Sequence, residues 1–235
     1  MKNYAVILAS GKGTRYGSEI PKQFVKINGK TIFEHSIEAF QKSEFIDCIV
    51  IVVTPEYRDY AEEILLKHNY DKVIKLLNGG EIRKESSYIG VNSIEDKEAN
   101  VLIHDCARPL VTQKIIKECV ESLKEHNAVN VAIPVTDTVI NVKNNLIESI
   151  PERKYLMQSQ TPQCFKLSLI KKAHELSKND SNFTDDCGLI IKYGLDDIYI
   201  VDGDKENIKI TYSLDMYLAE KILKNRKEIK GENND

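Results

Sequence analysis

Short runs of branched apolar residues recur along this chain, and they constrain its fold more than any other feature. Residues 49–53 (IVIVV) and 101–103 (VLI) contain no polar residue, so both faces of an extended chain would be apolar there. Such runs are typical of strands that are covered on both faces, as in the parallel sheets of α/β proteins. Strands are expected near 4–9, 46–53, 72–77, 99–104, 129–133 and 197–202.

Amphipathic segments separate these runs and are predicted to be helices. Thr31 and Glu34 have the spacing of a capping box, and Thr54 followed by Pro55 has the pattern of a second helix start. Further helices are expected near 81–95, 112–126, 168–178, 184–193 and 213–227. The alternation predicts an α/β fold with a doubly wound, mostly parallel sheet, in which ligands bind beyond the carboxyl ends of the strands.

One segment interrupts this alternation. Residues 137–143 and 146–150 alternate polar and apolar side chains on either side of Asn144 and Asn145, which predicts a β-hairpin. An isolated hairpin is only marginally stable in water. We therefore expect an arm, about 136–157, that packs on a second copy of the chain. A flexible surface hairpin is the alternative.

The composition is that of an ordinary globular protein. The 235 residues are 42% hydrophobic and 29% charged, and their formal net charge of -3 provides no global positive field for nucleic acid. No apolar run approaches the roughly 20 residues of a membrane span, and the N-terminus lacks a signal-peptide pattern. The five cysteines show no C-x-x-C spacing, which predicts reduced thiols and a cytoplasmic location. We expect residues 1–225 to form one domain and the charged tail, 226–235, to fray.

The loop after the first strand combines glycines with cations. Its glycines are Gly11, Gly13 and Gly17, and its cations, with those that follow closely, are Lys12, Arg15 and Lys22. The spacing is not that of a dinucleotide fingerprint, because Tyr16 stands where the third glycine would be, and the P-loop pattern is absent too. Close backbone N–H groups and local positive charge are suited to a triphosphate. A tight turn with solvated cations is the alternative.

A double glycine marks the start of the helix predicted near 81–95. Residues 78–80 (NGG) let the backbone pass close to a flat group, and Arg83 and Ser86 are three positions apart on the helix, so both can face one ligand. An ordinary glycine turn before a helix would give the same pattern.

Another pair of charged residues follows the strand near 99–104. Asp105 is a natural Mg²⁺ ligand at such a strand end, since Mg²⁺ takes one or two carboxylates together with phosphate oxygens. Arg108 could hold a second anion, and an Asp–Arg ion pair is the alternative. His104 is expected to be a hydrogen-bonded structural residue.

Weaker candidates lie in the second half of the chain. They are Arg153 and residues 161–163 (TPQ), 184–187 (TDDC) and 207–211 (NIKIT). Residues 184–187 are expected to start a helix with outward-facing hydroxyl and N–H groups. Residues 207–211 are expected to form a short strand on which Asn207 and Lys209 face the same way. An ordinary structural role explains each of these equally well.

Taken together, these segments resemble the cytidylyltransferases that join CTP to a small polyol phosphate. The motifs that carry the resemblance, from about residue 4 to 222, are 8–15 (LASGKGTR), 21–23 (PKQ), Gly79 and Gly80 with Arg83 and Ser86, His104 and Asp105 with Arg108, Asp137 and Thr138, 161–163 (TPQ) and 207–209 (NIK). The resemblance implies a Rossmann-like fold of the nucleotide-diphospho-sugar transferase type. It also implies CTP as substrate, Mg²⁺ as metal and a homodimer joined through the hairpin arm.

The resemblance further implies roles for individual residues. Catalytic positions are matched by Arg15, Lys22 and Lys209. Nucleotide-binding positions are matched by Leu8, Ala9, Ser10, Gly11, Lys12, Gly13, Gly79, Gly80, Arg83, Ser86 and Asp105. Acceptor-binding positions are matched by Arg108, Thr138, Arg153, Thr161, Thr184 and Asp185, of which Arg153 would reach the acceptor phosphate of the partner. Asp105 also matches a position near Mg²⁺.

Two branches of this family act on different acceptors, D-ribitol 5-phosphate and 2-C-methyl-D-erythritol 4-phosphate. Residues 6–15, 150–154 and 184–187 resemble the ribitol branch, although Ser10 replaces the usual glycine or alanine. We expect CTP and D-ribitol 5-phosphate to give CDP-ribitol and pyrophosphate, with the erythritol phosphate as the alternative acceptor. Sugar-phosphate uridylyl and guanylyl transferases share the first loop but lack residues 161–163 and the arm. A homologue that only binds nucleotide is a further alternative, against which the retained cations argue.

Overall fold

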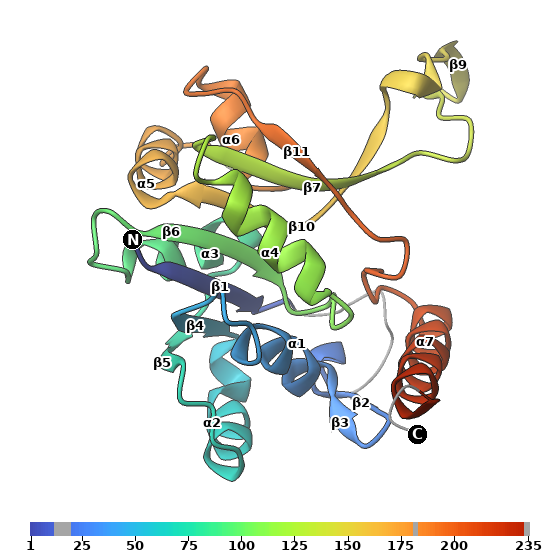
Figure 1. Cartoon of the computed structure of the whole chain (residues 1–235). Helices are drawn as coiled ribbons and strands as arrows, with labels where there is room; N and C mark the ends of the chain where they lie inside the picture. Colours follow the sequence, from blue (N-terminus) through green and yellow to red (C-terminus); the bar gives the residue numbers. More distant parts are fainter. Residues whose placement is uncertain (12–19, 181–182, 233–235) are drawn as a thin grey trace.

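Seven strands form one sheet through the centre of the molecule (Figure 1). The computed structural model describes residues 1–11, 20–180 and 183–232. The spatial order is β11 (Tyr199–Asp202), β7 (Ala128–Pro134), β10 (Met157–Lys166), β6 (Asn100–Asp105), β1 (Asn3–Ala9), β4 (Cys48–Val53) and β5 (Val73–Asn78). Neighbouring strands are parallel except where β10 runs antiparallel to β6 and β7. The six strands predicted between residues 4 and 202 and the predicted mostly parallel sheet are confirmed.

Strand β1 shows how the sheet is covered on both faces. Ala5 and Ile7 belong to one buried cluster, whereas Val6 and Leu8, which point the opposite way, belong to the other. The first cluster includes residues of α1 (Ile32–Gln41), α2 (Arg58–Lys67), α4 (Gln113–Ser122) and α7 (Ser213–Glu232). The second includes residues of α3 (Arg83–Asn92), α5 (Leu167–Leu176) and α6 (Cys187–Lys192). The sheet is doubly wound, as predicted.

Strand β10 is absent from the predicted strands because three of its six buried positions are polar, which breaks the apolar pattern that Cys164 and Phe165 continue. Gln160, Thr161 and Gln163 are at most 5% exposed. Gln160 donates to the Asp204 carbonyl over 2.8 Å, and the Thr161 hydroxyl lies 3.0 Å from a ring nitrogen of His104. Since each polar group finds a partner, the strand is buried without a continuous hydrophobic pattern.

The two predicted helix starts differ in outcome. Thr31, which ends a small hairpin of β2 (Lys26–Ile27) and β3 (Lys30–Thr31), forms the predicted capping box: its hydroxyl accepts from the Glu34 N–H, and the Glu34 carboxylate accepts from the Thr31 N–H. The second start is wrong in part. Pro55 opens a 3-10 helix, η2 (Pro55–Tyr57), that leads into α2, and the buried Thr54 hydroxyl caps nothing among the described residues.

Two predictions near the C-terminus need correction. Residues 207–211 are not a strand, because their backbone bonds go to the loop after β6: the Ile210 N–H donates to the Ala107 carbonyl, and Arg108 donates to the Asn207 carbonyl. Helix α7 continues past the predicted end at 227 to Glu232, so most of the tail expected to fray is helical.

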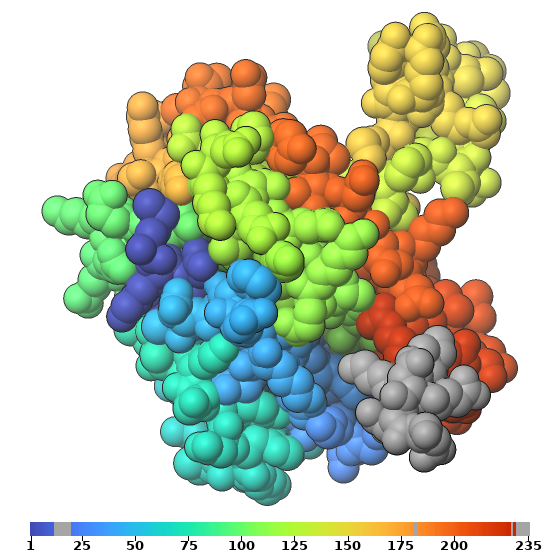
Figure 2. Space-filling view, in the orientation of Figure 1, coloured from blue at the N-terminus to red at the C-terminus, as the bar shows by residue number. Residues whose placement is uncertain are grey.

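The predicted hairpin is confirmed, and it projects from the body (Figures 1 and 2). Packing of this arm on a second copy stays a prediction. Strands β8 (Asn141–Lys143) and β9 (Leu146–Ser149) are antiparallel, and Asn144 and Asn145 between them have φ of 51° and 62°. Two consecutive positive φ values are the mark of a type I′ turn, in which asparagine is favoured. A short 3-10 helix, η3 (Arg153–Tyr155), follows before the chain returns along β10.

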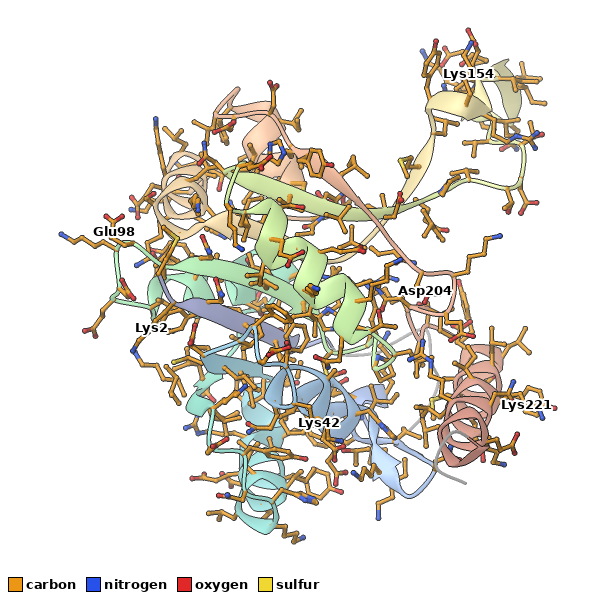
Figure 3. The ribbon with its side chains drawn as sticks, viewed as in Figure 1. Lys2, Lys42, Glu98, Lys154, Asp204 and Lys221 are labelled. Atoms are coloured by element: carbon orange, nitrogen blue, oxygen red, sulfur yellow. The ribbon has the colours of Figure 1, made fainter. Side chains whose placement is uncertain are left out.

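Charged side chains of both signs point outward around the body, as Lys2, Lys42, Glu98 and Lys221 illustrate (Figure 3). Each of the five cysteines lies in a described segment and is a free thiol. No helix of the described residues is long and apolar enough to cross a membrane.

Candidate active site

A cavity of about 410 Å³ opens at the carboxyl edge of the sheet. It is lined by Leu8, Ala9, Ser10, Gly11, Lys22, Gln23, Glu81, Ile82, Arg83, Asp105, Cys106, Ala107, Lys209 and Thr211. These residues come from the ends of β1 and β6, from the start of α3 and from the segment before α7. The volume is in the range of small-molecule sites, and the location is where α/β sheets bind ligands.

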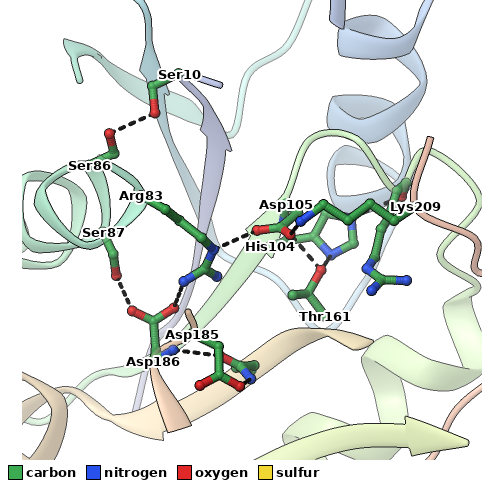
Figure 4. Close-up of polar contacts among 12 residues, drawn as sticks. Ser10, Arg83, Ser86, Ser87, His104, Asp105, Thr161, Asp185, Asp186 and Lys209 are labelled. Atoms are coloured by element: carbon green, nitrogen blue, oxygen red, sulfur yellow. Dashed lines mark hydrogen bonds and ion pairs between the residues drawn. The ribbon is translucent and has the colours of Figure 1, made fainter. Parts of the chain in front are cut away.

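The charge in this cavity is organised around the Asp105 carboxylate (Figure 4). Arg83 Nε donates to Asp105 Oδ1 over 2.9 Å, and Lys209 Nζ donates to Asp105 Oδ2 over 2.7 Å. Burial alone would raise the pKa of Asp105, but the two cations more than offset it and hold that pKa well below its ordinary value. Burial would likewise lower the pKa of Arg83, but Asp186 and Asp105 raise it. The site therefore keeps an ionised Asp105 carboxylate between Arg83 and Lys209.

The segment after the first loop is tied to both sides of the cavity. Lys22, at the start of η1 (Lys22–Phe24), donates from Nζ to the Ile210 carbonyl over 2.6 Å. Gln23 Nε2 donates to the Ala9 carbonyl (2.7 Å) and to the Gly11 carbonyl (3.1 Å). These bonds fix where β1 ends and bring Lys22 to the cavity wall.

The structure describes only some of the residues predicted to bind nucleotide in the first loop. Leu8, Ala9, Ser10 and Gly11 line the cavity. The predicted residues Lys12, Gly13 and Arg15 lie outside the described residues.

The double glycine is required by the close approach of two segments. A Cβ on Gly79 would lie 2.5 Å from Ser10 Cβ and 2.9 Å from Ser86 Oγ, and one on Gly80 would lie 2.4 Å from Glu85 Cβ. Ser86 is fully buried, and its Oγ is 2.6 Å from Ser10 Oγ. The hydroxyl that lines the cavity is thus that of Ser10, with Ser86 behind it.

His104 has the structural role predicted for it. Its Nε2 lies 3.0 Å from the Arg108 carbonyl, and its Nδ1 lies 3.0 Å from the Thr161 hydroxyl, which accepts from the Asp105 N–H. A carbonyl can only accept, so Nε2 carries the proton and Nδ1 accepts from Thr161. Burial lowers the pKa of His104 to about 4. A neutral histidine therefore fixes the end of β6 that carries Asp105.

The predicted acceptor-binding residues are not gathered in this cavity. Arg108 donates to the Asn207 carbonyl, and Thr161 supports His104 from behind. Thr184 is exposed, and Asp185 accepts from Gln163 Nε2 over 2.8 Å.

Thr138 and Arg153, also predicted to bind the acceptor, lie on the exposed arm. Arg153 donates from Nη1 to the Thr136 carbonyl and lines a second hollow, of about 550 Å³, at the base of the arm.

One buried carboxylate was not predicted as a site residue. Asp186 is 1% exposed, accepts from Arg83 Nη1 over 2.7 Å and also accepts from the Ser87 hydroxyl. The prediction that 184–187 begin a helix with outward-facing groups is wrong here: α6 begins at Cys187, and the residue before it points inward. Two acidic residues at a helix start are ordinarily both solvated, so the local sequence does not mark Asp186 as buried.

The predicted Mg²⁺ site can be tested against its donor set. The described residues contain no cluster of three or more His, Cys, Asp or Glu side chains that could hold a metal. Asp105 offers one carboxylate, both of whose oxygens already accept from cations. This set fits an ion that takes most of its ligands from a substrate's phosphates and from water, which is how Mg²⁺ is commonly held. Binding of Mg²⁺ at Asp105 remains a prediction.

Comparison with known proteins supplies the family. The model of the family IspD, 2-C-methyl-D-erythritol 4-phosphate cytidylyltransferase, matches residues 4–225. A 2-C-methyl-D-erythritol 4-phosphate cytidylyltransferase of Thermosipho melanesiensis is 41% identical over 94% of this chain and 98% of that protein. A bifunctional ribulose 5-phosphate reductase/CDP-ribitol pyrophosphorylase of Haemophilus influenzae is 39% identical over 96% of this chain and 49% of that protein.

Solved structures agree with the fold. The 4-diphosphocytidyl-2C-methyl-D-erythritol synthase of Anaerococcus prevotii superposes with a TM-score of 0.85 at 25% identity, covering 95% of this chain and 96% of the other. The 2-C-methyl-D-erythritol 4-phosphate cytidylyltransferase of Francisella tularensis gives a TM-score of 0.79 at 30% identity, covering 93% and 98%. The chain belongs to the IspD family of cytidylyltransferases and is a nucleotidyltransferase that uses CTP.

Proposed function

We propose that this enzyme transfers the cytidylyl group of CTP to the phosphate of a small polyol phosphate, with D-ribitol 5-phosphate as its preferred acceptor. The products are the CDP-polyol and pyrophosphate. The observation that carries the proposal is the cavity in which Arg83 and Lys209 pair with the Asp105 carboxylate and which Lys22 also lines, within a family that uses CTP.

The proposed reaction requires that the two substrates be positioned against each other and that positive charge surround their phosphates. An oxygen of the acceptor phosphate attacks the α-phosphorus of CTP, a new P–O bond forms, and the bond from that phosphorus to the pyrophosphate oxygen breaks. A phosphate monoester has its second pKa at about 6, so the attacking oxygen is largely deprotonated at pH 7 and needs no general base. The barrier is the repulsion between two anions and the charge that develops on the phosphate oxygens.

The residues of the cavity are suited to lowering that barrier. Lys22 and Lys209 both line the cavity, and their ammonium groups are suited to contact phosphate oxygens there. Arg15, which lies outside the described residues, would add a third cation from the first loop. Gly79, before α3, lets Ser10, whose hydroxyl lines the cavity, pack against that segment. Mg²⁺, if held by Asp105 and the triphosphate, would neutralise further phosphate charge.

The preference for ribitol phosphate is supported by local sequence. Residues 6–15, 150–154 and 184–187 resemble the branch that acts on D-ribitol 5-phosphate. The relative from Haemophilus influenzae, named as a CDP-ribitol pyrophosphorylase, is 39% identical.

A second acceptor, 2-C-methyl-D-erythritol 4-phosphate, is favoured by other observations. The matching family model carries that name, and so does the relative that is 41% identical. With this acceptor the reaction would belong to isoprenoid synthesis.

The arm is proposed to join two copies of the chain. Its apolar side chains are exposed, and Arg153 at its base lines a hollow that also contains Lys154. In the dimer, Arg153 and Thr138 of one copy would complete the acceptor site of the other. We expect this enzyme to work in the cytoplasm on CTP and a small phosphate, with neither nucleic acid nor membrane as partner.

Steady-state pyrophosphate release, with CTP and each of the two acceptors in turn, tests this proposal. The expected result is a higher kcat/KM with D-ribitol 5-phosphate and no release without an acceptor. A higher kcat/KM with 2-C-methyl-D-erythritol 4-phosphate would assign the second acceptor. If neither acceptor gave any release of pyrophosphate, the proposed function would be contradicted.

A further inference from the structure

The buried Asp186 carboxylate joins two elements through one residue of the cavity. Arg83 is the first residue of α3 and lines the cavity, whereas Asp186 immediately precedes α6 and is 1% exposed. Arg83 lies between two carboxylates: Nε donates to Asp105 and Nη1 donates to Asp186 over 2.7 Å (Figure 4). The direction of the guanidinium is thus set from both ends.

Asp186 is held rigidly in the position from which it contacts Arg83. Its Oδ1 accepts from the Ser87 hydroxyl while its Oδ2 accepts from Arg83. Arg83 and Ser87 are four residues apart on α3 and so share one face of the helix. The Asp186 N–H donates to Gln163 Oε1 of β10 over 2.9 Å, and the buried ring of His174 lies beside Ser87. One carboxylate therefore fixes the first turn of α3 relative to β10 and α6.

The Asp186 carboxylate does not cap the helix that it precedes, α6. Asp186 occupies the N-cap position of α6, yet its side chain makes no capping hydrogen bond there. A buried ion pair is also weak evidence of a stabilising role, because desolvation opposes the attraction between the charges. Arg83 Nη2 is buried and has no hydrogen-bond partner among the described residues, a cost that is tolerated most often at functional sites.

We infer that Asp186 is a positioning residue for CTP binding, which acts by holding Arg83 away from full engagement with Asp105. Without Asp186, the guanidinium is free to turn two donors of one edge onto the two Asp105 oxygens, in the bidentate geometry that Arg and carboxylates favour. Arg83 would then compete with Lys209 for Asp105 Oδ2 and would lose the orientation in which it faces the cavity. This inference rests on the proposed function, since it assumes that CTP binds in this cavity.

A double-mutant cycle tests the inference, with CTP affinity measured by calorimetry in the presence of MgCl₂ and without acceptor. Asp186→Asn removes the charge at nearly constant volume, and the cycle adds Arg83→Ala and the double variant. Asp186→Asn is expected to weaken CTP binding on the order of 10- to 100-fold, the scale of a misplaced contact group. In the Arg83→Ala background it is expected to have no further effect, because the group it positions is already absent. Asp197→Asn, an exposed carboxylate of the same half of the molecule, is the matched control and should bind CTP normally.

The outcomes separate the inference from the proposed function. A wild-type chain that binds no CTP would contradict the proposed function. Two other outcomes would contradict the inference alone, provided that the wild-type chain binds CTP. In one, Asp186→Asn lowers CTP affinity equally in the wild-type and Arg83→Ala backgrounds. In the other, it lowers CTP affinity in neither background.

If Asp186→Asn does not fold, Ser87→Ala carries the same test. It removes one of the two side-chain hydrogen bonds to Asp186 and should weaken CTP binding roughly fivefold. The loss should again vanish in the Arg83→Ala background. Unchanged CTP affinity in Ser87→Ala would then overturn the inference.

Discussion

The cavity and the arm differ in whether their side chains find partners within the chain. In the cavity, Arg83, Asp105 and Lys209 are bonded to one another within a single chain. On the arm, Leu146 and Ile147 are 72% and 61% exposed. Burying one such side chain is worth about 1.5–3 kcal/mol, and the body of the same chain does not supply the surface that would bury it. The contrast supports two separate proposals, that CTP binds in a cavity built by one chain and that the arm packs on a second chain.

Removing a cation from the cavity should have the largest effect. Lys22→Ala is expected to lower the rate of pyrophosphate release by about 10²–10³, since a donor to developing negative charge is lost, while circular dichroism shows an unchanged fold. Lys26→Ala, which removes an exposed lysine of the neighbouring β2, is the matched control and should be as active as wild type. If Lys22→Ala turned over at the wild-type rate, the reaction could not be assigned to this cavity.

Removing the central carboxylate should affect stability as well as activity. Asp105→Asn leaves Lys209 without its carboxylate partner and Arg83 with Asp186 alone, which should lower the free energy of unfolding by about 3 kcal/mol at pH 7. Urea titrations measure this change, and Asp197→Asn is again the control.

The same variant gives a pH dependence of definite sign. The pKa of Asp105 is lowered in the fold, because Arg83 and Lys209 outweigh burial. Its contribution to stability is therefore present above the unfolded-state pKa of about 4 and is lost as the pH falls below that value. The free energy of unfolding of wild type should drop more steeply than that of Asp105→Asn below about pH 4. Equal slopes would show that the ion pair does not perturb Asp105.

A charge on the arm should separate the two copies without harming the body. Ile147→Asp is expected to change the sedimentation mass from dimer to monomer, because burying the new carboxylate in an interface is costly. The melting temperature of the body should change little. Leu66→Asp, at an 82% exposed position on α2, is the control and should leave the mass unchanged. A wild-type chain that sediments as a clean monomer would contradict the proposed role of the arm.

The smallest effect is expected at the turn of the arm. Asn145 has φ of 62°, so Asn145→Ala should cost the hairpin about 1 kcal/mol, whereas Asn145→Gly should be tolerated. Hydrogen exchange at the amides of β8 and β9 measures the difference. Faster exchange in the glycine variant than in the alanine variant would argue against a type I′ turn.

The features that could be predicted from the sequence are those encoded in neighbouring residues. Apolar runs such as 49–53 mark buried strands, Thr31 and Glu34 cap a helix by themselves, and Asn144 with Asn145 specify a turn. In each case a few adjacent side chains carry enough preference to set the local structure. The position of the cavity followed, because it is a property of doubly wound sheets.

The features that could not be predicted depend on partners far away along the chain. Half of the buried positions of strand β10 are polar and rest on contacts such as that between Thr161 and His104, which interrupt its hydrophobic pattern. Residues 207–211 alternate like a strand but bond to the loop after β6. Asp186 gains its place from Arg83, 103 positions earlier in the chain. Periodicity registers none of these contacts.

The central claim is that the cavity moves a cytidylyl group from CTP to a phosphate monoester, and ³¹P NMR of the reaction mixture tests it most directly. With CTP, MgCl₂ and D-ribitol 5-phosphate, the account predicts that the acceptor's monoester signal and the β-phosphate signal of CTP disappear together. Signals of a diphosphate diester and of pyrophosphate should replace them in equal amounts. Release of CMP or inorganic phosphate with the acceptor's monoester signal unchanged would contradict the account, because it would mean that water, not the acceptor, attacks CTP.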